Sequence, residues 1–321
     1  MRYRQIGQTE ITVSEVGFGA WGIGGWAPGQ LSYGPVSETQ ASHALHAAFE
    51  EGITLFDTSP LYGEGKSETI IGKAFRGRRD QVVFATKVGM THFDQPDNFT
   101  PKSIEQSIED SLRRLQTDYL DIVQLHNPTL QTLRNNDELN KCLDNLQKSG
   151  KVRCLGISVQ SPHEGIEAIE IYPFKLIQAN LNMLDTRAIE CGLLTTIKTN
   201  GASLIARTPL CFGFLTNRFT ENTTFPEHDH RNRWSQKQVN RWIAMSNKVK
   251  TLIYDHQEGE LIPTALRFCL SYPEVSCVIP GIIQASEVSL NAEAGNLPPL
   301  SHSIQMAIEE LNRANTVFSN E

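Results

Sequence analysis

Eight short apolar runs alternate with amphipathic segments along most of this chain. The runs occupy residues 14–21, 53–59, 81–89, 119–127, 152–159, 176–182, 203–209 and 275–281. Their nearly continuous hydrophobicity is typical of strands that are buried on both faces of a parallel sheet. Strand and helix alternating eight times predict an α/β fold of the (β/α)8 TIM barrel type. A doubly wound open sheet is the alternative. It is disfavoured because the glycines of "GFGAWGIGG" (17–25) do not follow the first strand as a dinucleotide-binding turn would require.

Residues typical of helix ends flank the amphipathic segments. Ser37 begins a segment that stops at Gly52, and Thr100 with Pro101 begins another. The predicted helices therefore span about 37–52, 100–116, 137–150 and 187–201. Outside the barrel we expect an N-terminal β-hairpin (3–7 with 11–17), an irregular segment (210–235) and a C-terminal helix (304–317). No linker divides the chain, so we expect a single domain over residues 1–321.

Charge and cysteine usage exclude several classes of protein. The chain has 321 residues and a formal charge of −7, with no basic stripe that would favour nucleic acid. The first ten residues lack the apolar region of a signal peptide, and no apolar run is long enough to cross a membrane. The six cysteines are widely spaced, without a CxxC pair. We therefore expect a soluble protein of the reducing cytoplasm.

Polar side chains end six of the eight predicted strands. These residues are Asp57, Lys87, His126, Ser158, Asn182 and Arg207. One such residue alone would commonly just reach solvent. Six at the carboxyl face, where barrel enzymes place their active sites, favour a catalytic site.

The stretch "FDTSPLYGEG" (56–65) could by itself be an ordinary turn, because its short polar residues and proline suit one. Lys87 changes that interpretation. Asp57 and Lys87 end neighbouring strands, so they can form an ion pair that keeps the lysine charged. An ammonium beside Tyr62 favours the phenolate, which makes the phenol a suitable general acid. His126 could hydrogen-bond the same Tyr62 oxygen. Together these four side chains suit protonation of the alkoxide that forms in carbonyl reduction.

Three stretches resemble the signatures of the aldo-keto reductase family: "GITLFDTSPLYGEGKSETIIGKAF", "FATKVG" and "SLRRLQTDYLDIVQLHNP". The resemblance runs from the first apolar run to about residue 300. It implies an NADP(H)- or NAD(H)-dependent oxidoreductase that acts on small aldehydes or ketones, or on the matching alcohols. It further implies Tyr62 as proton donor, Lys87 and Asp57 as its tuning pair, and His126 as the residue that orients the carbonyl.

The same resemblance implies a set of cofactor contacts. They are Trp21, Gly22, Asp57, Ser158, Gln178, Arg207, Pro209, Leu210, Gly213, Leu215, Gly281, Ile283, Glu287 and Asn291. Two positions depart from the family pattern. Val159 replaces a common asparagine, which removes one contact to the nicotinamide carboxamide. Ile283 replaces a common cation, and losing that partner for the 2′-phosphate predicts a relaxed preference between NADPH and NADH.

Four aromatic residues and one asparagine lie near the strand ends. The candidate walls of the substrate pocket are Trp21, Trp26, Tyr33, Phe93 and Asn127. The aromatics of segment 210–235 could form a lid over the cofactor or a satellite core. His228, Asp229 and His230 stand side by side, but no third histidine or cysteine completes a metal site nearby, so no metal is assigned.

Two other functions compete with the reductase. A cofactor-binding regulatory subunit of membrane proteins would keep the fold without turnover, yet it would not need a paired lysine and tyrosine. An aldolase with Lys87 as Schiff-base nucleophile needs a neutral lysine, and Asp57 opposes that.

Overall fold

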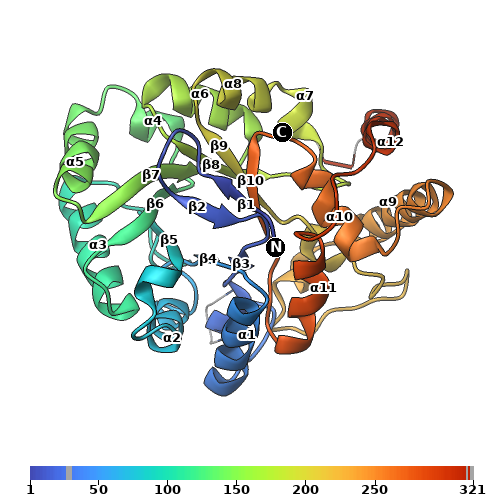
Figure 1. Ribbon diagram of the computed structural model, residues 1–321, viewed down its shortest axis with the longest axis horizontal. Helices are drawn as coiled ribbons and strands as arrows, with labels where there is room; N and C mark the ends of the chain where they lie inside the picture. Colours follow the sequence, from blue (N-terminus) through green and yellow to red (C-terminus); the bar gives the residue numbers. More distant parts are fainter. Residues whose placement is uncertain (27–30, 316, 319–321) are drawn as a thin grey trace.

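Eight parallel strands form a closed barrel at the centre of the molecule (Figure 1). The computed structural model describes residues 1–26, 31–315, 317 and 318. Strands adjacent in the barrel are also consecutive in the chain: β3 (Phe18–Gly19), β4 (Leu55–Asp57), β5 (Val83–Val88), β6 (Leu120–His126), β7 (Val152–Ser158), β8 (Leu176–Asn180), β9 (Ser203–Arg207) and β10 (Val275–Ile279). Parallel bridges from Val16 to Val278 and from Gly19 to Gly281 join the first strand to the last. The predicted barrel is confirmed, and its closure excludes the open doubly wound sheet.

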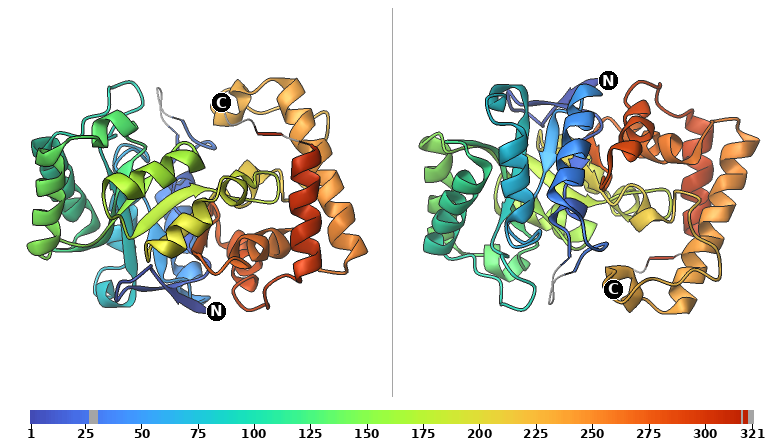
Figure 2. Two further views of the ribbon diagram at one scale, coloured as in Figure 1. Left: turned by 90° about the horizontal axis from the view of Figure 1, so that it is seen from above. Right: turned by 90° about the horizontal axis from the view of Figure 1, so that it is seen from below.

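Helices surround the barrel (Figure 1). They are α1 (Glu38–Glu50), α2 (Lys66–Ala74), α3 (Pro101–Leu115), α4 (Leu130–Leu133), α5 (Asp137–Lys148), α6 (Pro162–Ile171), α7 (Arg187–Glu190), α8 (Leu193–Thr199), α9 (Gln236–Asp255), α10 (Leu261–Leu270), α11 (Val288–Glu293) and α12 (His302–Ala314). Short 3-10 turns are η1 (Gly22–Gly24), η2 (Arg79–Gln81), η3 (Cys211–Gly213), η4 (His230–Arg233) and η5 (Ala285–Glu287). Helices α9 and α12 lie side by side at one edge of the molecule (Figure 2). Of the described helices, none is long and apolar enough to span a bilayer.

The predicted N-terminal hairpin consists of β1 (Tyr3–Gln5) and β2 (Thr12–Ser14), which pair antiparallel. Ile6, Ile11 and Val13 of this hairpin pack in one buried cluster with the side chains that fill the barrel. Among them are the first residues of several strands, such as Leu55 and Val83. The hairpin therefore closes the amino ends of the strands and leaves the carboxyl ends as the open face.

Most predicted helix boundaries are confirmed. The Ser37 hydroxyl accepts from the Gln40 backbone N–H and caps α1, and Gly52, after its end, has a φ of +85°. The helix predicted over 187–201 is wrong, because it is two short helices. Gly192 adopts a left-handed conformation with a φ of +87° and ends the first of them. The C-terminal helix ends at Ala314, three residues earlier than predicted; residue 316 lies outside the described residues.

The six cysteines are free thiols, and all but Cys191 are buried. Burial raises the pKa of Cys142 to about 11 and that of Cys154 to about 12. These thiols therefore stay protonated and act as small apolar groups.

Candidate active site

The four residues predicted to be catalytic come together at the open end of the barrel. Asp57 and His126 end β4 and β6, and Lys87 is the penultimate residue of β5 between them. Tyr62 lies in the turn that leads into α2. The Lys87 ammonium is 4.9 Å from the centre of the Tyr62 ring, and the rings of Tyr62 and His126 lie 6.3 Å apart, edge to face. The site therefore holds a phenol, an ammonium, a carboxylate and an imidazole.

Lys87 is fully buried and forms an ion pair with Asp57, with Nζ 2.5 Å from Oδ1. It also donates to the Thr58 carbonyl oxygen at 2.9 Å. Burial by itself would lower the lysine pKa, but the neighbouring Asp57 carboxylate and the hydroxyl of Tyr62 offset this, and the pKa is raised. Lys87 is therefore a charged group throughout the neutral pH range.

The second carboxylate oxygen of Asp57 accepts two amide hydrogen bonds. Gln124 donates to Oδ2 at 2.9 Å and Gln178 donates to it at 2.8 Å. Gln178 was predicted as a cofactor contact, and in the structure its amide is also tied to Asp57. Gln124 was not predicted. It lies two residues before His126, on the same side of β6, and that alternation could have identified it.

His126 is neutral in this site. Burial lowers its pKa well below the usual value, and the charges of Lys87 and Arg207 lower it further. Its Nδ1 lies 3.3 Å from the Ser59 hydroxyl, which also accepts from the Leu61 N–H at 3.2 Å. The Ser59 O–H can donate to Nδ1, and in that tautomer Nε2 carries the imidazole proton.

The turn that carries Tyr62 is held rigidly by close backbone packing. Gly63 has a φ of +62°, and a Cβ there would lie 2.5 Å from the Gly24 carbonyl oxygen. Behind the turn, the buried Glu68 pairs with Arg114 at 2.6 Å and accepts from the Thr86 hydroxyl at 2.5 Å. These contacts link α2 to α3 and β5, so the phenol is fixed relative to the strand that bears Lys87.

A cavity of about 600 Å³ opens above the four residues. Of the predicted cofactor contacts, those that line it are Trp21, Asp57, Gln178, Arg207, Pro209, Leu210, Gly213, Gly281, Ile283, Glu287 and Asn291. Of the predicted substrate-pocket residues, Tyr33, Phe93 and Asn127 also line it. Thus one cavity connects the catalytic cluster to the loops after β9 and β10.

Lys87 lies behind Asp57 and outside the lining, and so do five further predicted residues. Gly22 is buried against the Ile283 side chain, Leu215 is buried in the core, and Ser158 is buried beneath the cavity floor. Trp26 is 40% exposed and packs against His228 instead. Asn182 does not end a strand, because β8 stops at Asn180, which is the residue that lines the cavity. Asn182 turns away and donates to the Thr208 carbonyl oxygen at 3.0 Å.

Segment 210–235 packs on the protein core and also borders the cavity. Phe214, Phe219 and Phe225 pack in sequence at ring distances of 5.1 and 5.3 Å, and Phe214 also contacts Trp242 of α9 at 5.1 Å. Phe214 belongs to the main buried core instead of a satellite core, while Phe212, Gly213, Arg218 and Phe219 line the cavity. The segment is therefore both a packed unit and a cavity wall.

Residues 228–230, within the same segment, contact other parts of the protein instead of forming a metal site. Asp229 pairs with Arg231 at 2.6 Å. His230 is buried between Trp21 and Tyr33, at ring distances of 4.6 and 4.8 Å, and neither ring nitrogen has a hydrogen-bond partner among the described residues. Burial lowers its pKa to about 3. In the described part of the chain, no group of three metal-binding side chains forms.

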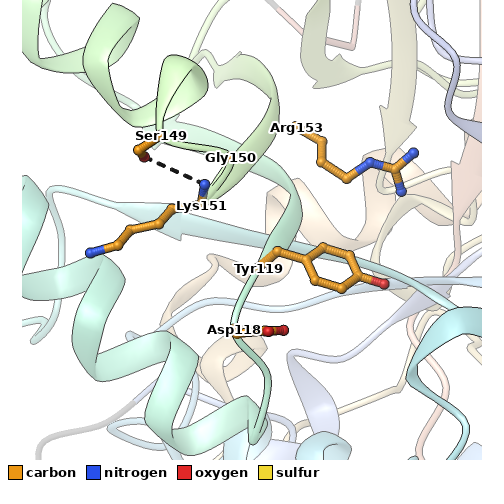
Figure 3. Close-up of a pocket in the computed structure, with 6 residues that line it drawn as sticks. All are labelled: Asp118, Tyr119, Ser149, Gly150, Lys151 and Arg153. Atoms are coloured by element: carbon orange, nitrogen blue, oxygen red, sulfur yellow. Dashed lines mark hydrogen bonds between the residues drawn. The ribbon is translucent and has the colours of Figure 1, made fainter.

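A second hollow lies at the opposite end of the barrel, beside the amino ends of β6 and β7 (Figure 3). It is lined by Asp118, Tyr119, Ser149, Gly150, Lys151 and Arg153. Lys151 pairs with Glu109, and Arg153 pairs with Asp121. Both cations therefore have carboxylate partners, so among the described residues this hollow offers no unpaired cation.

Comparison with known proteins identifies relatives over nearly the whole chain. The model of the Aldo/keto reductase family matches residues 15–313. Aldo-keto reductase YhdN of Bacillus subtilis is 33% identical over 312 residues, which cover 91% of each chain. Glycerol dehydrogenase AKR11B4 from Gluconobacter oxydans has a similar structure, with a TM-score of 0.82, 28% identity and coverage of 99% of this chain and 97% of that one. The holo form of aldo-keto reductase AKR11C1 from Bacillus halodurans has a TM-score of 0.79 and 28% identity, with coverage of 97% and 96%.

Proposed function

The chain belongs to the aldo/keto reductase family, and we propose that it reduces small aldehydes or ketones to alcohols, or runs the reverse reaction, with NAD(P)(H). The observation that carries this proposal is the Lys87–Asp57 ion pair with Tyr62 and His126 beside it on one cavity. A binding module has no use for a buried ammonium next to a phenol, whereas a proton donor does.

The residues present fit a dinucleotide along the cavity. At its far end, Asn291 Oδ1 is buried without a hydrogen-bond partner among the described residues, so it can accept from a ligand N–H. Its Nδ2 donates to the Glu287 carbonyl oxygen, which fixes the orientation of the amide. Asn291, Gly281 and Leu210 would hold the nucleotide, and the nicotinamide would supply or accept the hydride.

Tyr62 is the proposed proton donor for the oxygen that gains charge as the carbonyl is reduced. The Lys87 ammonium stabilises the phenolate that remains, and Asp57 holds the ammonium in place through its 2.5 Å ion pair. Neutral His126, with its proton on Nε2, donates a hydrogen bond to the substrate oxygen and so orients it. The low His126 pKa preserves this hydrogen-bonding state across the neutral range.

The two competing functions are less compatible with this geometry. A Schiff-base aldolase requires a neutral lysine nucleophile, yet the Lys87 pKa is raised and its ammonium is paired. A regulatory subunit without turnover would not require the four groups to converge. Neither alternative is favoured by a contact in the site.

We further propose that the enzyme discriminates weakly between NADPH and NADH. Ile283 is apolar and packs on Gly22, and Arg218, a cation on the same wall, is paired with Glu287 at 3.1 Å. A paired, exposed arginine binds a 2′-phosphate less selectively than a free bidentate one.

The test of the reductase proposal is a spectrophotometric screen at 340 nm. Both cofactors are assayed against a panel of aldehydes and ketones, and their oxidised forms against the matching alcohols. Turnover with at least one carbonyl class supports the proposal. Tight cofactor binding without turnover on any substrate would instead favour the regulatory subunit.

A further inference from the structure

Arg207 brings a positive charge to the floor of the cavity without a carboxylate partner. Its guanidinium donates only to neutral oxygens. Nε donates to Asn180 Oδ1 at 2.8 Å, Nη1 to Ser158 Oγ at 2.8 Å and Asn127 Oδ1 at 3.2 Å, and Nη2 to the Val159 carbonyl oxygen at 2.6 Å. Arg207 is half-buried, and cations withdrawn from water are normally paired with a carboxylate, so this arrangement needs a functional reason.

The carboxylates that act on Arg207 electrostatically are engaged elsewhere. Asp57 pairs with Lys87, Asp185 pairs with Arg187, and Glu164 accepts from the backbone N–H groups of Gln160 and Ser161. Across the described residues, no ion pair involves Arg207. With Lys87 neutralised by Asp57, Arg207 leaves an uncompensated positive charge close to the catalytic cluster.

Other arginines of the cavity differ in this respect. Arg218 pairs with Glu287, and Arg231 pairs with Asp229. Arg233 is exposed, so water screens its charge. Arg207 and Arg231 are both half-buried, and of these two Arg207 is the one whose hydrogen bonds go to neutral partners. Burial accordingly lowers its pKa, although the group remains charged.

The hydrogen bonds also determine which surface Arg207 can offer to a ligand. The N–H groups of a guanidinium lie in its plane, and four of the five donate to protein acceptors, which leaves one N–H on Nη2. The flat face of the group carries no N–H and is open to contact with a planar ligand in the cavity that Arg207 lines. A guanidinium face stacks well on planar rings.

Hydride transfer requires the nicotinamide to contact a carbonyl held at Tyr62 and His126, and Arg207 borders that position. Its partner Asn127 directly follows His126, and its charge helps to lower the His126 pKa. The nicotinamide ring is neutral when reduced and carries one positive charge when oxidised. The phosphates and the adenosine are the same in both forms.

Resting on the reductase function proposed above, we propose that Arg207 makes this site select the reduced nicotinamide cofactor over the oxidised one. The unpaired guanidinium repels the oxidised, cationic ring and accepts the neutral, reduced ring. Between unit charges a few ångströms apart in a partly buried site, the repulsion corresponds to a preference of about tenfold or more.

The experiment measures dissociation constants by titration calorimetry for NADPH, NADP+, NADH and NAD+, without substrate. The wild type should bind each reduced form about tenfold or more tightly than its oxidised form. Arg207→Met and Arg207→Gln, which remove the charge, should bring this ratio close to one. Arg207→Lys, which keeps the charge, should keep most of the preference for the reduced forms. Two neutral variants are used so that misfolding of one, detected by circular dichroism, does not decide the outcome.

Two controls separate the possible failures. Arg218→Met removes a charge from the same cavity, but a paired one, so the oxidised-to-reduced ratio should stay at its wild-type value. ADP-ribose lacks the nicotinamide, so its dissociation constant should be equal in the wild type and Arg207→Met. A wild-type ratio near one, or an unchanged ratio in folded Arg207→Met, would overturn the inference while leaving the reductase intact. Failure of every dinucleotide to bind would instead overturn the proposed function itself.

Discussion

Lys87 and Asp57 form an ion pair of 2.5 Å between neighbouring barrel strands, and both side chains are closed to solvent. The strand register produces this contact. Asp57 pairs with Ala85, and Lys87 follows two residues later, so its side chain projects to the same side as Ala85. Two further amides complete the hydrogen bonding of Asp57. The ion pair therefore belongs both to the barrel interior and to the proposed site.

Asp57→Asn should destabilise the fold strongly. The substitution leaves the buried Lys87 ammonium without its counter-ion, and breaking one side of a buried pair costs about 3–5 kcal/mol. The free energy of unfolding from urea titration measures the effect.

The control is Glu38→Gln, which breaks the exposed Lys73–Glu38 pair of 2.8 Å. Exposed pairs contribute about 0–1 kcal/mol, so this variant should remain close to the wild type. Equal losses in Asp57→Asn and Glu38→Gln would show that Lys87 does not depend on its partner.

His230→Phe should make the fold less sensitive to acid. The folded-state pKa is about 3 because of burial, whereas an unfolded histidine titrates near 6.5. Below pH of about 6.5 the unfolded chain therefore binds a proton that the folded chain does not, and stability falls as the pH falls. His126, whose pKa is also lowered by burial, acts in the same direction.

Without His230, the unfolded chain binds one proton fewer on acidification. The slope of unfolding free energy against pH below about 6 should therefore decrease by roughly 1 kcal/mol per pH unit. Because neither ring nitrogen of His230 has a hydrogen-bond partner in the described part of the chain, a phenyl ring should be accepted there at pH 7. Tyr33→Phe alters the same aromatic cluster and should keep the wild-type slope. An unchanged slope in His230→Phe would contradict the burial argument.

The features that follow from local chemistry could be predicted from the sequence. Apolar runs identified all eight strands, and polar residues at their ends identified Asp57, Lys87 and His126, because a closed barrel brings strand ends together. Tyr62 was predicted from the ammonium of Lys87 expected beside it, since a tyrosine in a turn is otherwise ordinary, and the family resemblance implied the same role.

What could not be predicted depends on packing across the barrel. The Arg207 network joins three strand ends through neutral acceptors, and no sequence pattern indicates which acceptor each N–H reaches. The end of β8 at Asn180 was misplaced to Asn182, because the apolar run continues through Leu181. The helix predicted over 187–201 was broken at Gly192, since an internal glycine does not reveal its φ.

Ile283→Arg should raise the preference for NADPH. The wild type should show kcat/KM values for NADPH and NADH within about tenfold of each other, because no bidentate cation stands at position 283. An arginine there can pair with the 2′-phosphate, and a charge-assisted bidentate contact should shift the ratio by about tenfold or more.

Ile283→Met is the matched control, because it keeps an apolar side chain of similar size and should retain the wild-type ratio. A wild type that already prefers NADPH by several hundredfold would show that another group, such as Arg218, binds the 2′-phosphate.

The most direct test of the proposed catalytic site is the turnover number of Tyr62→Phe, measured together with its cofactor dissociation constant. The swap removes only the hydroxyl, so cofactor binding should stay within about threefold of the wild type. Loss of the general acid should lower kcat by about 10²–10⁴-fold. A Tyr62→Phe enzyme that binds cofactor and retains more than a tenth of the wild-type rate would contradict Tyr62 as the proton donor.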